Sequence, residues 1–435
     1  MSTIIHISNE NDIANANANA NANANANANA NSSNYKKLSL VYSFASLMEK
    51  QCGQDTKKII HSVKVGLALV LVSLLYLLDP LFEQVGENAM WAIMTVVVVF
   101  EFFAGALLSK GLLRGLGTIL GGGLGCVAAV LADDLGKIGN AAVVGSSVFI
   151  FGAAATYCRM IPSIKSKYDY GFMIFILTFN LVAVSGLRAD KVIELARERL
   201  STIGMGFAVC IFTSLLIFPM WASDELHRLT SSKFDKLACC IEDCMKAYFN
   251  VVDEKESMPK IKVRDCKAVL HSKSNDESLA NFARWEPWHG RFGFYYPWDK
   301  YLKLGEILRE LASIILSLQE CLGSPLQPST QLKLAINEPC ESVGLSLGLT
   351  LRELGRSIMN MKRCQATVQI IPKLQLVKQE LILLSTSPKL KGIANVESLA
   401  IANFLFLMME IVDKVEVVAK EVEALGEAAG FQLSK

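Results

Sequence analysis

Long stretches without a charged residue are the feature that most restricts what this chain can fold into. Four of them, 18 to 24 residues long, cover residues 115–132, 138–158, 170–187 and 200–223. An apolar helix of about 20 residues crosses the hydrocarbon core of a bilayer. Two further stretches, 65–82 and 88–109, contain only one acid each, Asp79 and Glu101. The pattern therefore predicts six transmembrane helices.

The composition agrees with a membrane protein, because 52% of the 435 residues are hydrophobic and only 19% are charged. In hydrocarbon every backbone polar group must be paired inside the protein, which a helix achieves by itself. After residue 224, apolar and polar residues alternate with the period of an amphipathic helix. We expect an all-α membrane protein with six transmembrane helices followed by a helical cytosolic domain.

The expected domain boundaries follow these changes in composition. Residues 1–60 form a cytosolic N-terminus that contains an Ala-Asn tract at 14–31. That tract has almost no apolar bulk to bury, so we expect disorder there. Residues 61–223 form the transmembrane domain, and residues 224–435 form the cytosolic domain.

Basic residues predict the orientation of the helices, because Lys and Arg accumulate in cytoplasmic loops. Lysines precede the first span, and basic residues also occupy the predicted second loop (Lys110, Arg114) and fourth loop (Arg159, Lys165). The fifth loop should be external, yet it contains Arg188, Lys191, Arg197 and Arg199. Basic residues on the external side of a span depart from this rule, and such departures often occur at functional sites. The alternative is that Arg188 and Lys191 lie at the lipid headgroups, paired with Asp190 and Glu194.

Several classes of protein are disfavoured. The formal net charge of +2 lacks the strongly basic character of a nucleic-acid binder. No nucleophile–base pair or metal-ligand motif stands out, so we expect neither an enzyme nor a metal or other cofactor. Cys239, Cys240 and Cys244 are expected to be structural thiols, because no more than two of them share a helix face. An aromatic loop at 285–298 is expected to pack in a core or contact another subunit.

Several motifs resemble one known family. They are WAIMTVVVVFEF at 91–102, LSKGL at 108–112, GGG at 121–123, YDYG at 168–171, RLSTI at 199–203, PMWA at 219–222 and WEPWHG at 285–290. In this order they are similar to the plant aluminium-activated malate transporter family, and the resemblance covers roughly residues 35–435. It implies an anion channel or transporter for malate and often inorganic anions. It also implies six helices per subunit, a helical cytosolic domain and a homodimer around a shared pore.

Fixed positive charge would line the path of such an anion. Malate is a dianion at neutral pH, and losing its hydration in a low-dielectric pore is costly. Arg stays charged and bonds carboxylates with two parallel N–H groups. The candidates for the anion pathway are Arg199, Arg197, Arg188, Lys64, Lys110, Arg114, Arg159 and Lys165. Arg199 leads, because it opens the sixth span within the RLSTI motif.

Some of these assignments have alternatives. Arg197 lies about 200° around a helix from Arg199, so the two cannot face one pore equally. Lys110 and Arg114 share a helix face and would form a cytosolic vestibule, or else would anchor the helix at the lipid headgroups. Glu101 is expected to pair with Lys110 or Arg159, with a direct role in gating as the alternative.

Three external acids suggest a cation site. Asp190 and Glu194 lie on one helix face, and Asp79 ends the first span on the same side. Their oxygens would suit a hard, highly charged cation, for which the resemblance suggests aluminium. Ion pairs with Arg188 or Lys191 are the alternative.

We expect a multi-pass protein of the plasma membrane ahead of the vacuolar membrane. A membrane-anchored scaffold or receptor, whose helical cytosolic domain binds partners, is the alternative to an anion channel. An anchor has no need of arginines at the external start of a span.

Overall fold

The computed structural model describes residues 53–77, 90–133, 136–186, 192–249, 263–293, 295–322, 328–386 and 395–432. The chain divides into two compact units, Met1–Leu71 and Val72–Lys435. The described part of the first unit lies in helix α2 (Gly53–Leu77). This helix begins with charged residues and becomes apolar after Lys64, as expected of a first span. No β-strand occurs within the ranges given above, so the described chain is helical.

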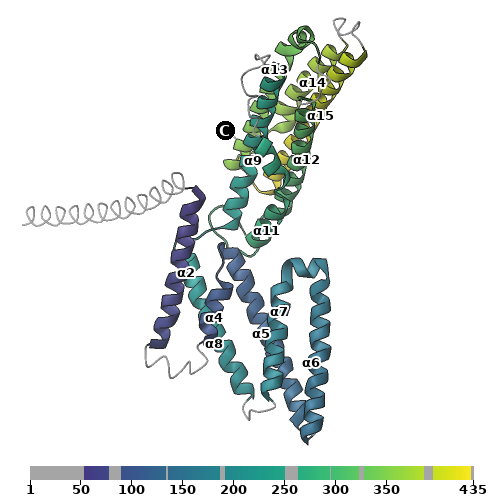
Figure 1. Cartoon of the computed structure of the whole chain (residues 1–435). Helices are drawn as coiled ribbons and strands as arrows, with labels where there is room; N and C mark the ends of the chain where they lie inside the picture. The colour runs from purple at the N-terminus through teal and green to yellow at the C-terminus, as the bar shows by residue number, and fades with distance from the viewer. Residues whose placement is uncertain are drawn as a thin grey trace, which may run out of the picture. The chain divides into compact units, whose positions relative to one another are not determined.

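The second unit begins with a group of apolar helices (Figure 1). They are α4 (Met90–Val99), α5 (Ala104–Asp133), α6 (Gly136–Met160), α7 (Pro162–Gly186) and α8 (Val192–Leu216). Four of the described helices contain segments long and apolar enough to cross a membrane. They are Ala104–Ala132, Ile138–Met160, Lys167–Ser185 and Arg197–Leu216. The third to sixth predicted spans are thereby confirmed as long apolar helices, and the full count of six stays a prediction.

The turn before the third span was predicted in the wrong place. The chain breaks at residues 100–103, and α5 then runs without interruption through Lys110 and Arg114. The prediction treated two basic residues as a loop, but Lys and Arg are good helix formers. Their charges are accommodated by polar partners rather than by a break in the helix. The second span is correspondingly short, because α4 ends at Val99.

The sixth span also differs from the prediction at both ends. Helix α8 begins before Arg197 and Arg199, so both lie within the helix. It ends at Leu216, shortly before Phe218, whose φ of 46° is incompatible with a right-handed helix. Pro219 follows and has no N–H group to continue the hydrogen-bond ladder.

Glycines bring the backbones of α5 and α7 into direct contact. A Cβ atom on Gly117 would lie 2.7 Å from the carbonyl oxygen of Gly171, and one on Gly121 would lie 2.7 Å from that of Phe175. Small residues at helix interfaces in membranes permit this close approach. Because the contacts advance in the same direction along both helices, α5 and α7 are parallel, as Figure 1 also shows.

The remaining helices form the C-terminal helical region. They are α9 (Ala222–Phe249), α10 (Val263–Leu270), α11 (Lys273–Ala283), α12 (Trp298–Leu322), α13 (Thr330–Met359), the π-helix η2 (Ala366–Ile370), α14 (Ile371–Ser385) and α15 (Asn395–Ala428). They share one hydrophobic core, in which Leu237, Leu308, Leu351 and Met408 are fully buried. Periodic apolar residues on each helix supply this core, as the sequence predicted.

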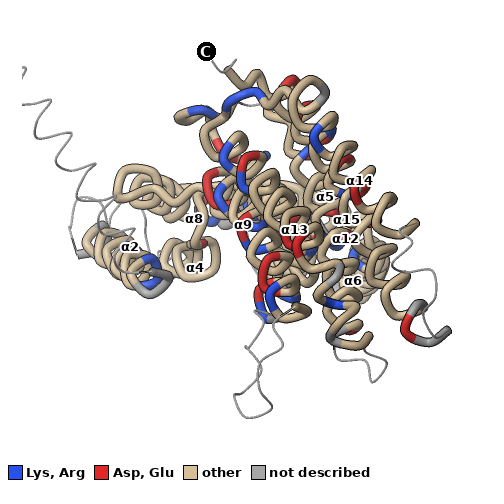
Figure 2. Tube along the Cα trace, turned by 90° about the horizontal axis from the view of Figure 1, so that it is seen from above, with Lys and Arg blue, Asp and Glu red and all other residues tan. Residues whose placement is uncertain are grey.

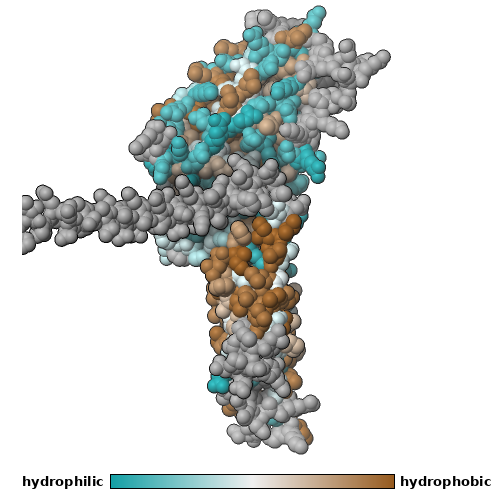
Figure 3. Space-filling view, turned by 90° about the vertical axis from the view of Figure 1, so that its left-hand side faces the viewer, coloured by the Kyte–Doolittle hydropathy of each residue, from teal (hydrophilic) through white to brown (hydrophobic). Residues whose placement is uncertain are grey.

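The two groups of helices differ in surface chemistry. Figure 2 shows charged residues gathered along α9 and α13, whereas the tube of α4 has none. On the face shown in Figure 3, hydrophobic surface gathers over the apolar helices and hydrophilic surface over the C-terminal helical region. This contrast is what a protein placed partly in lipid and partly in water requires.

Replacing Gly121 with Ala should destabilise the protein, although Ala is the better helix former. The new methyl group would press on the backbone of Phe175 and Phe179, and such overpacking costs about 1–3 kcal/mol. Gly123→Ala is the matched control, because nothing lies within 4 Å of its Cβ position. We expect a lower unfolding temperature for Gly121→Ala alone, measured on purified protein. Equal temperatures for the two variants would contradict the described α5–α7 contact.

Candidate functional site

Arg199 is buried among the apolar helices beside an aromatic ring. Its side chain is 8% exposed, and its guanidinium carbon lies 4.0 Å from the centre of the Trp91 ring on α4. Its Nε atom has no hydrogen-bond partner, and no carboxylate pairs with it among the described residues. An aromatic face attracts a cation without neutralising it. Arg199 therefore keeps its full positive charge in a buried position.

Arg114 is held in a similar way on α5. It is 5% exposed, and Nη1 donates a hydrogen bond of 3.2 Å to the hydroxyl of Tyr170 on α7. Its Nε atom also lacks a partner, and no ion pair to it occurs in the described chain. A single neutral hydroxyl leaves most of the five N–H donors of the guanidinium available.

The two arginines lie at neighbouring depths. Helices α5 and α8 are antiparallel, because Ala104 at the start of α5 donates a backbone hydrogen bond to Met220 after the end of α8. Gly111 packs directly against the ring of Phe207. Arg114 is three residues beyond Gly111 and Arg199 is eight residues before Phe207. At a rise of 1.5 Å per residue, their offset along the helix axes is about 7–8 Å.

Lys110, unlike Arg114, has an acidic partner in the described chain. It forms an ion pair with Glu101 in the turn between α4 and α5, which confirms the predicted pairing of Glu101. Its Nζ atom also lies 5.9 Å from the centre of the Tyr170 ring. The structure thus brings both predicted vestibule residues to Tyr170, but only Arg114 retains an unpaired charge.

The predicted residues at the α6–α7 turn are less suited to bind an anion. Arg159 is bonded through two nitrogens to Asp169, at 2.7 and 3.2 Å, which closes the α6–α7 hairpin. It also lies at the edge of a largely apolar groove of about 600 Å³ along α7. Lys165 and, on α8, Arg197 are exposed. None of the three approaches Arg114 or Arg199 in the contacts of the described chain.

Other predicted residues are not placed beside these. Lys64 lies on α2 in the first unit. Arg188, Asp79 and Asp190 lie outside the described residues, and of Glu194 only the backbone, in α8, is described. The predicted external cation site therefore also lies outside the described side chains.

Glu286 caps the first helix of the C-terminal helical region. It is 5% exposed, and its two carboxylate oxygens accept backbone hydrogen bonds from Ala222 at 2.6 Å and Ser223 at 3.2 Å. These are the first N–H groups of α9, which have no partner within the helix. Burial raises the pKa of Glu286, and the hydrogen bonds from Ser223 and Ala222 oppose that rise.

His289 completes the same junction. Its ring stacks on Trp221 with the centroids 3.8 Å apart, and Nδ1 donates to the carbonyl of Pro287 at 2.8 Å. Nε2 is then free to accept from the hydroxyl of Ser223 at 3.0 Å. Gly105 near the start of α5 touches the backbone of Phe282 and the side chain of Glu286. The aromatic loop thus joins α5, α9 and α11. It packs into the core through Phe292 and Trp298, as predicted, whereas Trp288 and Tyr295 are exposed.

A buried hydrogen-bonded chain lies one helical turn further along α9. Burial lowers the pKa of His227, whose Nε2 donates to the Met359 carbonyl at 3.4 Å. The Tyr301 hydroxyl donates to Nδ1 of His227 at 2.7 Å and accepts from Tyr296 at 3.1 Å. These bonds link α9 to α12 and to the end of α13.

Sequence reasoning missed three side chains that position these groups. Trp91 and Tyr170 were noticed only within motifs, although each is an aromatic residue near the end of an apolar span, where it can cover a neighbouring cation. Glu286 was read as part of an aromatic loop. An acid between Trp285 and Pro287 is a signal of a buried carboxylate, but its partner cannot be inferred from spacing.

The family model and the curated relatives that match this chain carry the same family name. The family model described as "Aluminium activated malate transporter" matches residues 50–390. Aluminum-activated malate transporter 13 of Arabidopsis thaliana is 45% identical over 322 residues, covering 72% of this chain and 60% of the relative. Aluminum-activated malate transporter 12 of the same plant is 44% identical over 316 residues, with coverage of 72% and 56%.

A relative from another plant matches over more of its length. Aluminum-activated malate transporter 1 of Triticum aestivum is 37% identical over 408 residues, covering 89% of this chain and 86% of the relative. By contrast, the chain spans less than two thirds of the length of each of the two Arabidopsis proteins.

Replacing Glu286 with Gln should loosen the junction. The amide nitrogen cannot accept a hydrogen bond, so an N–H of Ala222 or Ser223 loses its partner in a buried position. Such a loss costs about 1–3 kcal/mol. We expect a lower unfolding temperature for the purified chain. Glu277→Gln, on the exposed side of α11, is the control and should behave as the unchanged protein; an equal effect of both changes would refute the capping role.

Proposed function

The chain belongs to the aluminium activated malate transporter family, and on that premise we propose that it is an anion channel that passes malate and inorganic anions across a membrane. The curated relatives carry malate transport in their names. The apolar helices supply the membrane-spanning part that such an activity needs.

One observation supports this function above the others. Arg114 and Arg199 are both buried among apolar helices, and neither meets a carboxylate in the described chain. A charged residue placed deep in a membrane costs about 2.5–3.5 kcal/mol on insertion scales. A membrane anchor gains nothing from two such charges, whereas a passing anion would offset them.

The way the two arginines are held suits conduction rather than tight binding. Trp91 and the Tyr170 hydroxyl fix the guanidinium groups but leave N–H donors free for a carboxylate. A dianion would meet two sites of moderate affinity, offset by about 7–8 Å along the helices, and not one site that encloses it and binds it tightly. Conduction needs such sites, because an ion must leave as readily as it enters.

The other predicted basic residues, the domains and the location complete the proposal. We place Arg197, Arg188, Lys64, Lys110, Arg159 and Lys165 along the entrances of the path, and the pore at the centre of a homodimer. The C-terminal helical region, with residues 224–435 as its domain, is assigned to the cytosol, and the plasma membrane is favoured. Asp79, Asp190 and Glu194 are assigned to an external cation site.

Arg199→Ala should reduce malate current about tenfold or more. Hydrogen bonds to charged groups contribute about 1.5–3 kcal/mol, and 1.4 kcal/mol corresponds to a factor of ten. The measurement is voltage-clamp recording with malate inside and chloride outside, together with surface abundance of each variant.

Two further variants make this test specific. Arg264→Ala, which removes the same side chain from an exposed position on α10 outside the path, is the control and should keep most of the current. Arg199→Lys keeps the charge but loses the planar fork, so it should conduct with a lower preference for malate over chloride. Full current in Arg199→Ala at normal surface abundance would contradict the assignment, as would equal losses in both alanine variants.

A further inference from the structure

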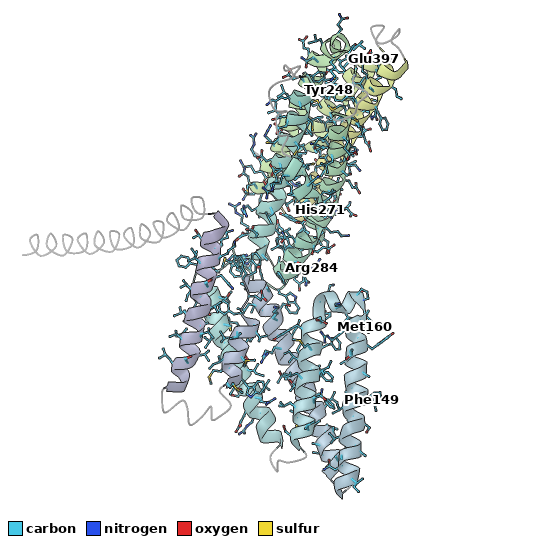
Figure 4. The ribbon with its side chains drawn as sticks, viewed as in Figure 1. Phe149, Met160, Tyr248, His271, Arg284 and Glu397 are labelled. Atoms are coloured by element: carbon cyan, nitrogen blue, oxygen red, sulfur yellow. The ribbon has the colours of Figure 1, made fainter. Side chains whose placement is uncertain are left out.

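A second cationic site lies in the C-terminal helical region, away from the apolar helices. It is a pocket of about 260 Å³ between α9, α10 and α11. Its polar lining consists of Ser232, Lys233, Lys236, His271, Ser272, Asn275 and Asp276. His271 marks the turn between α10 and α11 in Figure 4. None of these residues takes part in the proposed anion path.

Positive charge exceeds negative charge at this pocket. The Nζ atom of Lys233 donates to Oδ2 of Asp276 at 2.5 Å, and Arg309 on α12 donates to the same oxygen at 3.2 Å. Lys236 is half-buried one turn further along α9 and has no acidic partner in the described chain. Three cations therefore face a single carboxylate. Buried charge of one sign is costly unless an opposite charge meets it.

The carboxylate of Asp276 is satisfied on one side only. Lys233, Arg309 and the Ser272 hydroxyl all donate to Oδ2, the last at 3.0 Å. The other oxygen, Oδ1, is buried and has no hydrogen-bond partner among the described protein groups. A buried acceptor without a donor costs about 1–3 kcal/mol. Oδ1 of Asp276 therefore needs a hydrogen-bond donor that the described protein groups do not supply.

The N-terminus of α11 adds to the positive potential. Ser272 occupies the N-cap position, but its hydroxyl is bonded to the Asp276 side chain and accepts no hydrogen bond from a backbone N–H group of the first turn of α11. Ser272, Asn275 and Asp276 all line the pocket, so the uncapped first turn of this 11-residue helix lies at its wall. Free N–H groups at a helix start favour an anion.

We propose that this pocket binds a small oxyanion that also carries a hydroxyl donor. Its negative oxygens would meet Lys236, Lys233 and the first N–H groups of α11, and its hydroxyl would donate to Oδ1 of Asp276. Two ligands have this chemistry: a 2-hydroxydicarboxylate such as malate, and a hydrogen phosphate ion. At about 30 Å³ per water in the liquid, the pocket holds roughly nine waters, which suits ligands of this size.

Hydrogen–deuterium exchange of the purified full-length chain tests the site locally. The probes are malate, inorganic phosphate, and succinate, which has the two carboxylates of malate but no hydroxyl. We expect malate or phosphate to slow exchange in peptides covering residues 229–236 and 263–276. Succinate should need at least a tenfold higher concentration. The two effective probes, tested separately, distinguish the two sources of the ligand.

Three variants separate this pocket from the anion path. Lys236→Gln should raise the half-saturating concentration at least tenfold. Lys267→Gln removes the same charge from an exposed position on α10 outside the pocket, and should leave it unchanged. Arg199→Ala should also leave it unchanged, because the readout is binding to α9–α11 and not current. The outcome for malate conduction is thus independent of the outcome here.

The outcomes that overturn the proposal are equally specific. Absence of protection by both malate and phosphate removes the site. Protection that persists in Lys236→Gln, or that disappears in Arg199→Ala, assigns the binding to another place. Equal potency of malate and succinate, without an effect of phosphate, removes the role of Oδ1 of Asp276.

Discussion

The hydrogen bonds from the start of α9 to the Glu286 carboxylate join two parts of the chain that are built for different solvents. Helix α8 ends among apolar helices, and α9 begins six residues after its last residue, in a region of balanced charge. The N–H groups exposed at that start need acceptors, and Glu286 supplies both from a distant loop. Because Gly105 also packs against the Glu286 side chain, Glu286 holds the starts of α5 and α9 together. Arg114 lies on α5, and Arg199 lies on α8, the helix that precedes α9.

The sequence predicts the long apolar helices well, because uncharged length is a direct physical requirement of the membrane. It misplaces the turn before α5, because charge alone does not break a helix and Lys110 finds Glu101 across the turn. The position of Arg199 at the start of the sixth span, within the RLSTI motif, makes this residue a candidate. The sequence does not predict Trp91 beside it, because a motif does not reveal which side chain of another helix packs over a residue. The meeting of Arg114 with Tyr170, 56 residues apart, is likewise a property of the packing.

The described part of the second unit holds buried cations in two contrasting arrangements. Among the apolar helices, Trp91 and Tyr170 hold guanidinium groups without cancelling their charge. In the C-terminal helical region, Lys233 and Arg309 share the carboxylate of Asp276, which compensates half of their charge. The first arrangement keeps a field that acts on a mobile ion. The second fixes three helices to one another and leaves an excess of positive charge at the pocket beside them.

The glycine contacts between α5 and α7 have a mechanical consequence. Where backbone meets backbone there is no layer of side chains that can change rotamer, so the two helices can neither slide nor roll against each other without steric overlap. They act as one rigid strut that carries Arg114. The neighbouring contact, between Gly111 and the Phe207 ring, contains a side chain that can turn. Any movement of Arg199 relative to Arg114 would therefore arise from α8 and not from a shift between α5 and α7.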